Sequence, residues 1–329
     1  ITRDKKEYWA MFYSAAGGGV LIALMALFKT YLGSIIDDKV WKGLAEGLNY
    51  GFGFMVIFML HFTVATKQPA MTAARFAEAV EKNPQGKTLN MKLAQLLVDV
   101  FRSQSVAVLG NVVVAMGLAA LIAFVYQHQT GEPLMNSENI AYQLHRIDPL
   151  DGSLWFAAIA GVWLFCSGII SGYFDNRSNY LNMRMRLAQH PLLKKLMSEK
   201  SRVKFANYMH ENYGSLIGNF CFGMLLGLTG LVGYLTHLPL DIRHVAFSSA
   251  NLGYSAVSGQ FAYPFFLQCI AFVLLIGLVN LMVSFSLTLW VALRSLNTEI
   301  DSWWAIWHEV CQIVRKRPLS LFFPVQLDK

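Results

Sequence analysis

The sequence predicts an all-α membrane protein that crosses the bilayer six times. Three observations predict this class: 55% of the 329 residues are hydrophobic, only 14% are charged, and long apolar stretches recur along the chain. A soluble domain carries about 25% charged residues, so this chain has too little polar surface to cover a water-soluble core. The 23 Phe, 13 Tyr and 8 Trp also exclude a disordered chain, because so many apolar rings do not stay in water.

Six apolar stretches have about the 20 residues that a helix needs to cross the hydrocarbon. They are residues 9–28, 48–66, 105–126, 154–174, 213–235 and 265–293. Each is too continuously apolar for a β-barrel strand, in which apolar and polar residues alternate over about 10 residues. We therefore predict six transmembrane helices.

Lysine and arginine alternate between the connecting segments. Of the 27, 22 lie in residues 1–8, 67–104, 175–212 and 294–329, and five lie in 29–47, 127–153 and 236–264. Cytoplasmic loops are the basic ones, so we predict that both termini lie in the cytoplasm. The net charge of +7 then reflects the anionic lipids of the inner leaflet, and nucleic acid is not an expected partner.

The third and fifth predicted spans share a pattern that predicts an internal repeat. Gly110-Asn111 is matched 108 residues later by Gly218-Asn219, and Asn83-Pro84 in one basic connector corresponds to His190-Pro191 in the other. We interpret residues 44–126 and 153–235 as two copies of one unit, in which two spans are joined by a helical hairpin arm. Both copies begin and end on the same side of the membrane, so the repeat is parallel.

The remaining segments complete the predicted organisation. Residues 1–43 hold the first span and an outer loop, 127–152 a periplasmic loop, 236–293 a periplasmic loop and the sixth span, and 294–329 a cytoplasmic helix and tail. In that last segment Trp303, Trp307, Val310 and Val314 recur with helical spacing and Arg315 follows. This composition is typical of a helix that lies at the lipid interface.

Four strings in this chain resemble a bacterial membrane family named site-specific recombinase. They are ATKQPAMTA at 65–73, GYFDN at 172–176, DIRH at 241–244 and SANLG at 249–253. The resemblance implies that the chain lies in the bacterial inner membrane, and that a longer parent protein has a helical cytoplasmic region before Ile1. It supplies no catalytic or binding residues to transfer to this chain.

The first candidate site is a helix start beside a cation. Lys67 and Gln68 precede Pro69 where the second span meets the cytoplasm, and a helix that begins there offers free N–H groups to a phosphate such as a lipid headgroup. In the second copy Arg177 is the corresponding cation, after Asp175-Asn176. The alternative is a plain helix break with a cation that reaches the membrane surface.

Polar side chains inside the spans form the second group of candidates. Asn111 and Asn219 each need a partner in the hydrocarbon, either as hydrogen-bonded links between helices or as the lining of a polar path. His61 is predicted well inside the second span, where a buried ionisable group suggests function. A neutral histidine bonded to a backbone carbonyl is the simpler interpretation.

Asp241, Arg243 and His244 form the third group, in the last outer loop. They are either paired surface charges or contacts for a periplasmic partner or ligand. The sequence shows no metal-ligand spacing and no cofactor motif, so we predict neither a metal nor a cofactor.

The sequence supports three functions in decreasing order. The first is a non-enzymatic scaffold or docking platform whose cytoplasmic arms bind a protein partner or a second copy, next to membrane lipids. The second is a carrier or lipid-handling protein that uses the interface between the two repeats. The third, DNA recombination, is disfavoured because none of the eight His is followed three residues later by Arg, as a tyrosine recombinase requires.

Overall fold

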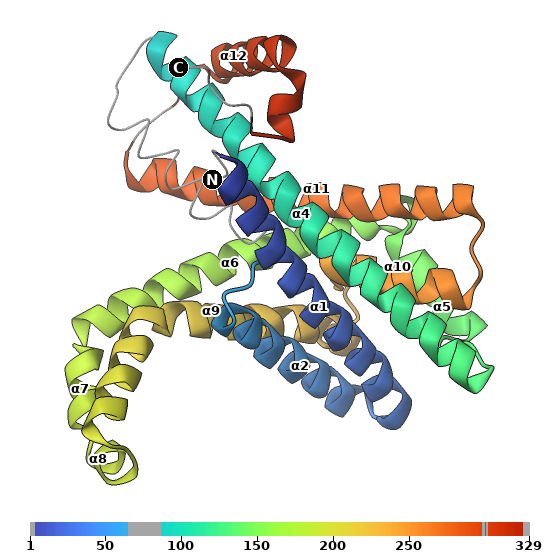
Figure 1. Ribbon diagram of the computed structural model, residues 1–329, viewed down its shortest axis with the longest axis horizontal. Coiled ribbons are helices and arrows are strands. Elements are labelled where there is room, and N and C mark those ends of the chain that lie inside the picture. Colours follow the sequence, from blue (N-terminus) through green and yellow to red (C-terminus); the bar gives the residue numbers. More distant parts are fainter. Residues whose placement is uncertain (1–3, 65–86, 298–299, 301, 325–329) are drawn as a thin grey trace.

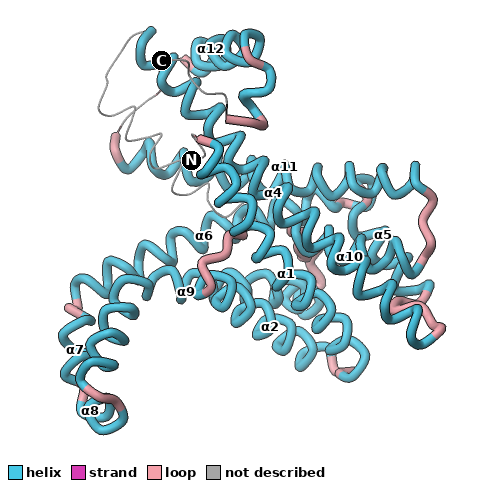
Figure 2. Tube along the Cα trace, in the orientation of Figure 1, coloured by secondary structure: helices cyan, strands magenta, loops and turns pink. Residues whose placement is uncertain are grey.

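The computed structural model describes residues 4–64, 87–297, 300 and 302–324, and within these ranges the chain forms helices and no strand (Figures 1 and 2). The all-α prediction is confirmed. The elements in chain order are α1 (Lys5–Ile35), α2 (Lys39–Met59), α4 (Lys87–Thr130), α5 (Ser137–Ile147), η1 (Pro149–Asp151), α6 (Ser153–Tyr180), α7 (Met183–Gln189), α8 (Pro191–Leu196), α9 (Glu199–Thr236), α10 (Val245–Ser258), α11 (Tyr263–Ser295), α12 (Trp303–Lys316) and η2 (Pro318–Leu321).

Among the described residues, five helices are long and apolar enough to cross a membrane: α1, α4, α6, α9 and α11. They correspond to five of the six predicted spans. The remaining helix, α2, overlaps the predicted second span but carries Lys42 and Glu46 in its first half, which lowers its hydropathy. These long apolar helices are consistent with a membrane protein, and the second predicted span, which α2 overlaps, stays a prediction.

The end of α2 differs from the prediction. The helix stops at Met59, and His61 adopts a left-handed backbone with φ of 58° that turns the chain back over α1. There the Thr63 amide donates to the Ser14 carbonyl oxygen at 3.1 Å. The prediction that His61 lies inside a span is wrong, because apolar composition marks the length of a stretch but not the residue at which a helix ends.

The long helices pack in pairs that the predicted repeat does not describe. Within the described part of the chain α4 lies along α1, whereas α9 lies along both α2 and α6. The two Gly-Asn positions meet partners that the repeat does not relate: Gly110 meets the Phe12 carbonyl of α1, whereas Gly218 meets Ser171 of α6. The repeat stays a prediction, and most of its first arm, residues 65–86, lies outside the described residues.

Glycines bring α2 and α9 into backbone contact. A methyl group on Gly223 would strike the backbone of Tyr50 and Gly51, and one on Gly227 would strike the backbone of Gly47. Small residues spaced four apart on each helix allow this close approach, as in many membrane helix pairs.

The segment 236–264, predicted to be an outer loop, contains a buried helix. Ten residues of α10 are buried, and the helix packs against α4, α11 and α1. Its Tyr254 side chain is fully buried and donates a hydrogen bond to the Ala23 carbonyl oxygen of α1 at 3.0 Å. At 14 residues α10 is too short to cross a bilayer, so span length alone misses it.

Two features extend from the bundle. An arm (residues 172–214) extends at the lower left of Figure 1 and consists of the ends of α6 and α9 with α7 and α8. The connectors 36–38 and 259–262 lie towards the right of the same view. At the top α12 packs on α4 through Ile306 and Val310, while Trp303 and Trp307 are about half exposed. The predicted four-residue face of α12 is therefore divided, since Val310 faces the protein.

We predict that Gly227→Ala lowers the free energy of unfolding by about 1–3 kcal/mol, because the added methyl group separates α2 from α9. Thermal or SDS unfolding of the purified protein in mild detergent measures this. The matched control is Gly117→Ala on α4, where a methyl group meets nothing within 4 Å. Equal effects of the two substitutions would contradict the close packing.

Candidate functional site

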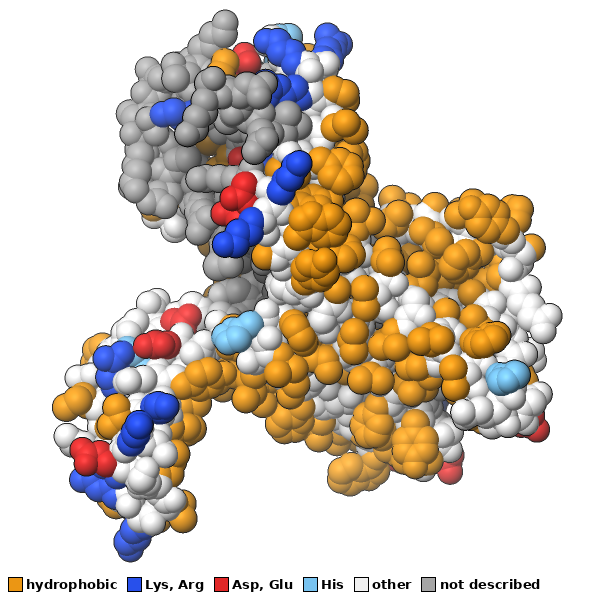
Figure 3. Space-filling view, viewed as in Figure 1, with side chains coloured by type: hydrophobic (Ala, Val, Ile, Leu, Met, Phe, Trp, Pro, Cys, Tyr) orange, Lys and Arg blue, Asp and Glu red, His pale blue; other side chains and the backbone are white. Residues whose placement is uncertain are grey.

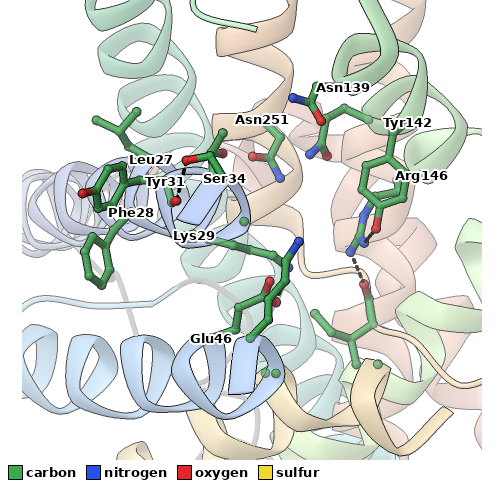
Figure 4. Close-up of a pocket in the computed structure, with 18 of the residues that line it drawn as sticks. Leu27, Phe28, Lys29, Tyr31, Ser34, Glu46, Asn139, Tyr142, Arg146 and Asn251 are labelled. Atoms are coloured by element: carbon green, nitrogen blue, oxygen red, sulfur yellow. Dashed lines mark hydrogen bonds and ion pairs between the residues drawn. The ribbon is translucent and has the colours of Figure 1, made fainter. Parts of the chain in front are cut away.

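A cavity of about 1180 Å³ opens at the end of the bundle where α1 turns into α2 (Figure 4). Its walls come from α1, α2, α5 and α9, with the ends of α4 and the segment 240–242. The ionisable side chains that line it, other than tyrosines, are Lys29, Lys39, Lys42, Glu46, Arg146 and Asp241. Four cations therefore face two carboxylates, in a wall that is otherwise largely apolar and tyrosine-rich.

The α1–α2 hairpin positions the first ion pair. The Asp38 side chain accepts hydrogen bonds from the Val40 and Trp41 amides and starts α2 after a three-residue connector, 36–38. About two turns from the helix ends, Lys29 Nζ lies 3.0 Å from Glu46 Oε2. Figure 4 shows both side chains facing the cavity.

A second ion network forms the opposite wall. The Asp241 carboxylate lies 2.7 Å from an Arg243 Nη1 and 3.3 Å from an Arg146 Nη1 of α5, and Arg146 also donates to the Tyr142 hydroxyl at 2.6 Å. Burial by itself raises the pKa of Asp241, but the two guanidinium groups outweigh it and lower this pKa to about 2. The carboxylate is therefore charged at any physiological pH.

The structure buries two of the three residues that we predicted on an exposed outer loop, and Asp241 is partly exposed. Arg243 is 6% exposed, its Nε donates to the Arg146 carbonyl oxygen at 2.7 Å, and its guanidinium lies over the Phe156 ring. His244 is 1% exposed among phenylalanine rings that include Phe222. The surface placement is wrong, because the segment enters the bundle as it approaches α10.

Asn280 of α11 anchors this buried segment. Its Oδ1 accepts from the Val245 amide at 3.1 Å, and its Nδ2 donates to the Ala157 and Arg243 carbonyl oxygens at 2.8 and 2.9 Å. A fully buried amide thus satisfies backbone groups at the start of α10 that have no partner within that helix. The anchor fixes the approach of Asp241 to the cavity.

The two predicted intramembrane asparagines lie away from the cavity. Asn111 is fully buried, and its Nδ2 donates to the carbonyl oxygens of Ala15 and Thr63. Asn219 is 7% exposed and donates to the Ser215 carbonyl oxygen in its own helix at 2.7 Å. Asn111 thus links α4 to α1 and to the segment after α2, in a packed region.

Only the second copy of the predicted anion site lies within the described residues. Lys67 and Gln68 lie outside the described residues. Arg177 is exposed on α6, which continues without a break to Tyr180, so the helix start that we expected at Asp175 is absent. No proline interrupts α6, and the Asp175 carboxylate instead accepts from the Gly214 amide of α9 at 2.9 Å.

Sequence reasoning missed Lys29, Glu46 and Arg146 as site residues. The apolar stretches that predict the spans do not reach these residues. The segment 29–47 is therefore predicted to be an outer loop. The available signal was the helix itself: Asp38 is a good N-cap, and the residues on either side of 36–38 contain no proline or run of glycines to stop a helix.

Comparison with known proteins decides the family. The sequence model of the family described as "Site-specific recombinase" matches residues 1–324. The chain belongs to the site-specific recombinase family. This confirms the resemblance seen in the four sequence strings. No curated protein and no solved structure matches the chain.

In this member of the site-specific recombinase family, the described residues include no group of three or more His, Cys, Asp or Glu that could hold a metal ion. The chemistry that the geometry offers is electrostatic: fixed cations and carboxylates around a large space. Charged groups arranged in this way are suited to hold a charged or zwitterionic group.

We predict that Asp241→Asn lowers the free energy of unfolding by about 1–3 kcal/mol at pH 7, because Arg146 and Arg243 lose their shared carboxylate. The folded-state pKa is depressed, so the wild-type contribution is complete above about pH 4 and is lost as pH falls towards 2. Thermal unfolding in detergent, followed from pH 7 down towards pH 2, measures the loss of stability in Asp241→Asn and its dependence on pH. The control is exposed Glu132→Gln, and a pH-independent difference between wild type and Asp241→Asn would contradict the account.

Proposed function

We propose that this member of the site-specific recombinase family is a non-enzymatic, multi-pass protein of the bacterial inner membrane that presents a docking platform to the cytoplasm. The observation that carries the proposal is the arm. Helices α6 and α9 continue past the apolar bundle as a pair and are closed by α7 and α8 (Figure 1). An enzyme would place reactive groups in a cleft, whereas this arm offers an exposed surface.

The surface of the arm is basic and partly apolar. Four exposed cations lie near its tip: Arg184, Arg186, Lys194 and Lys195. Two leucines in the same part of the arm, Leu192 and Leu196, are 61% and 79% exposed. Figure 3 shows blue side chains gathered on the arm, while orange apolar side chains cover the bundle. This combination favours an acidic protein partner that also covers the leucines.

The proposed orientation follows from the lysine and arginine bias. In it α2 is the second span, both termini and the arm are cytoplasmic, and the connectors 36–38 and 259–262 are periplasmic. The directions of the helices support this, because in Figure 1 the N-terminus and the arm lie towards the left and these connectors towards the right. The apolar surface of the bundle between them is suited to contact lipid.

We predict that Asp37→Cys, Glu132→Cys and Gln260→Cys are labelled in intact cells by a membrane-impermeant maleimide, and that Lys194→Cys is labelled only after lysis. The wild-type chain, with its four free cysteines, gives the background. Labelling of Lys194→Cys in intact cells would contradict the orientation. Protection of Asp37→Cys in intact cells would contradict α2 as a membrane span.

We predict that reversing the four arm charges to Glu releases a protein that co-purifies in mild detergent, while membrane insertion and yield are unchanged. Quantitative mass spectrometry of the purified material measures the loss, expected to be at least about tenfold for several charge contacts. The control is reversal of Arg315, Lys316 and Arg317 at the exposed end of α12. Equal loss from both variants, or no specific partner with the wild type, would argue against the platform.

The carrier alternative required a path that reaches Asn111 and Asn219. Both side chains are buried away from the cavity, so the geometry does not favour that path. The interface between the two predicted repeats does open at one end, where Glu46 and Gly227 line the charged cavity. DNA recombination stays the disfavoured third function, tested by strand-transfer activity of the purified parent protein.

A further inference from the structure

An apolar groove continues from the charged cavity along the outside of α1 and α2. It has a volume of about 510 Å³, and Leu24 and Phe28 line both spaces. Asn49 is its one polar lining residue, and the Asn49 amide donates to the Met25 carbonyl oxygen at 3.0 Å, so no strong donor faces the groove. The two spaces therefore form one site with a charged end and an apolar end.

The groove faces outward. Leu24, Leu48, Phe52 and Val56 line it and are 40–52% exposed, on helices whose surface is suited to contact lipid. From Phe28 to Leu21 the groove follows α1 for about 10 Å, at 1.5 Å per residue. A hydrocarbon chain suits this groove because eight of its nine lining residues are apolar or glycine.

The charged end carries two more cations than carboxylates. Lys29 is held by Glu46 and Arg146 by Asp241, whereas Lys42 has no acidic partner among the described residues and Lys39 lies over the Tyr234 ring. A phosphate provides the missing negative charge and accepts charge-assisted hydrogen bonds from ammonium groups.

We propose that this site binds one anionic phospholipid, with its phosphate beside Lys42 and Lys39 in the cavity and one acyl chain in the α1–α2 groove. The Lys29–Glu46 pair lies between the two ends. Glu46 holds the Lys29 ammonium in the cavity wall and balances its charge, which leaves Lys42 and Lys39 as the cations for the phosphate. The site lies at the end of the bundle opposite the arm, so the proposal goes beyond the docking function and does not depend on it.

Native mass spectrometry of the delipidated full chain, titrated with phosphatidylglycerol, tests the proposal. We expect Lys42→Gln and Leu24→Trp each to raise the Kd for phosphatidylglycerol about tenfold, by removing the unpaired cation and by filling the groove. The matched controls are Lys194→Gln on the arm and Leu121→Trp at an exposed position of α4 outside both spaces, and these should leave the Kd unchanged. A wild-type Kd no tighter for phosphatidylglycerol than for phosphatidylcholine would overturn the assignment of an anionic lipid.

A second arm of the experiment separates a lipid from a soluble phosphate. Glycerol 3-phosphate carries the charge without a chain, so we expect it to displace phosphatidylglycerol only at a concentration at least about 100-fold higher. Displacement at comparable concentrations would overturn the acyl-chain part and assign the cavity to a soluble anion. If Leu24→Trp alters thermal unfolding, Val56→Trp, further along the groove, replaces it.

Discussion

The anchoring of α10 by Asn280 is the interaction on which much of this structure depends. A helix that enters an apolar bundle without crossing it leaves its first amide groups in a medium that offers no water. Asn280 satisfies one of these amides and also binds two carbonyl oxygens, one on α6 and one on the approach to α10. Burying a polar side chain there is favourable because the alternative is several unpaired backbone groups.

This anchor has consequences for the cavity. Because Asn280 holds the Arg243 carbonyl, the segment before α10 passes between α5 and α9, and Asp241 meets Arg146 from α5. Asn251 of α10 lines the same space (Figure 4). The cavity is therefore a product of the re-entrant helix, whose short length leaves room at one end of the bundle.

Close packing beside the cavity limits how far it extends between the helices. Gly223 and Gly227 bring α9 against the backbone of α2, and Asn111 joins α4 to α1. Backbone contact of this kind leaves no room for a continuous path between the helices. The described helices are thus in close contact right beside the cavity, and the arm extends from the opposite end of the bundle.

Much of the fold could be predicted from the sequence, because apolar length and charge bias are properties of the chain itself. Five of the predicted spans coincide with long apolar helices, and the family strings correctly indicated the family. The ends of helices could not be predicted as well. The left-handed backbone at His61 and the continuation of α6 to Tyr180 depend on local backbone geometry, which composition does not predict.

The candidate site was decided by tertiary structure. Four of its charged residues are far apart in sequence: Lys29, Glu46, Arg146 and Asp241. The sequence predicts each of them in an exposed connector. They form one site only because two helices extend beyond their apolar cores and a 14-residue helix folds back into the bundle. The sequence by itself determined the long apolar helices, which have the length and composition to cross a membrane. Which polar groups meet there was settled by packing, since contacts between distant segments are not encoded in the hydropathy of any one of them.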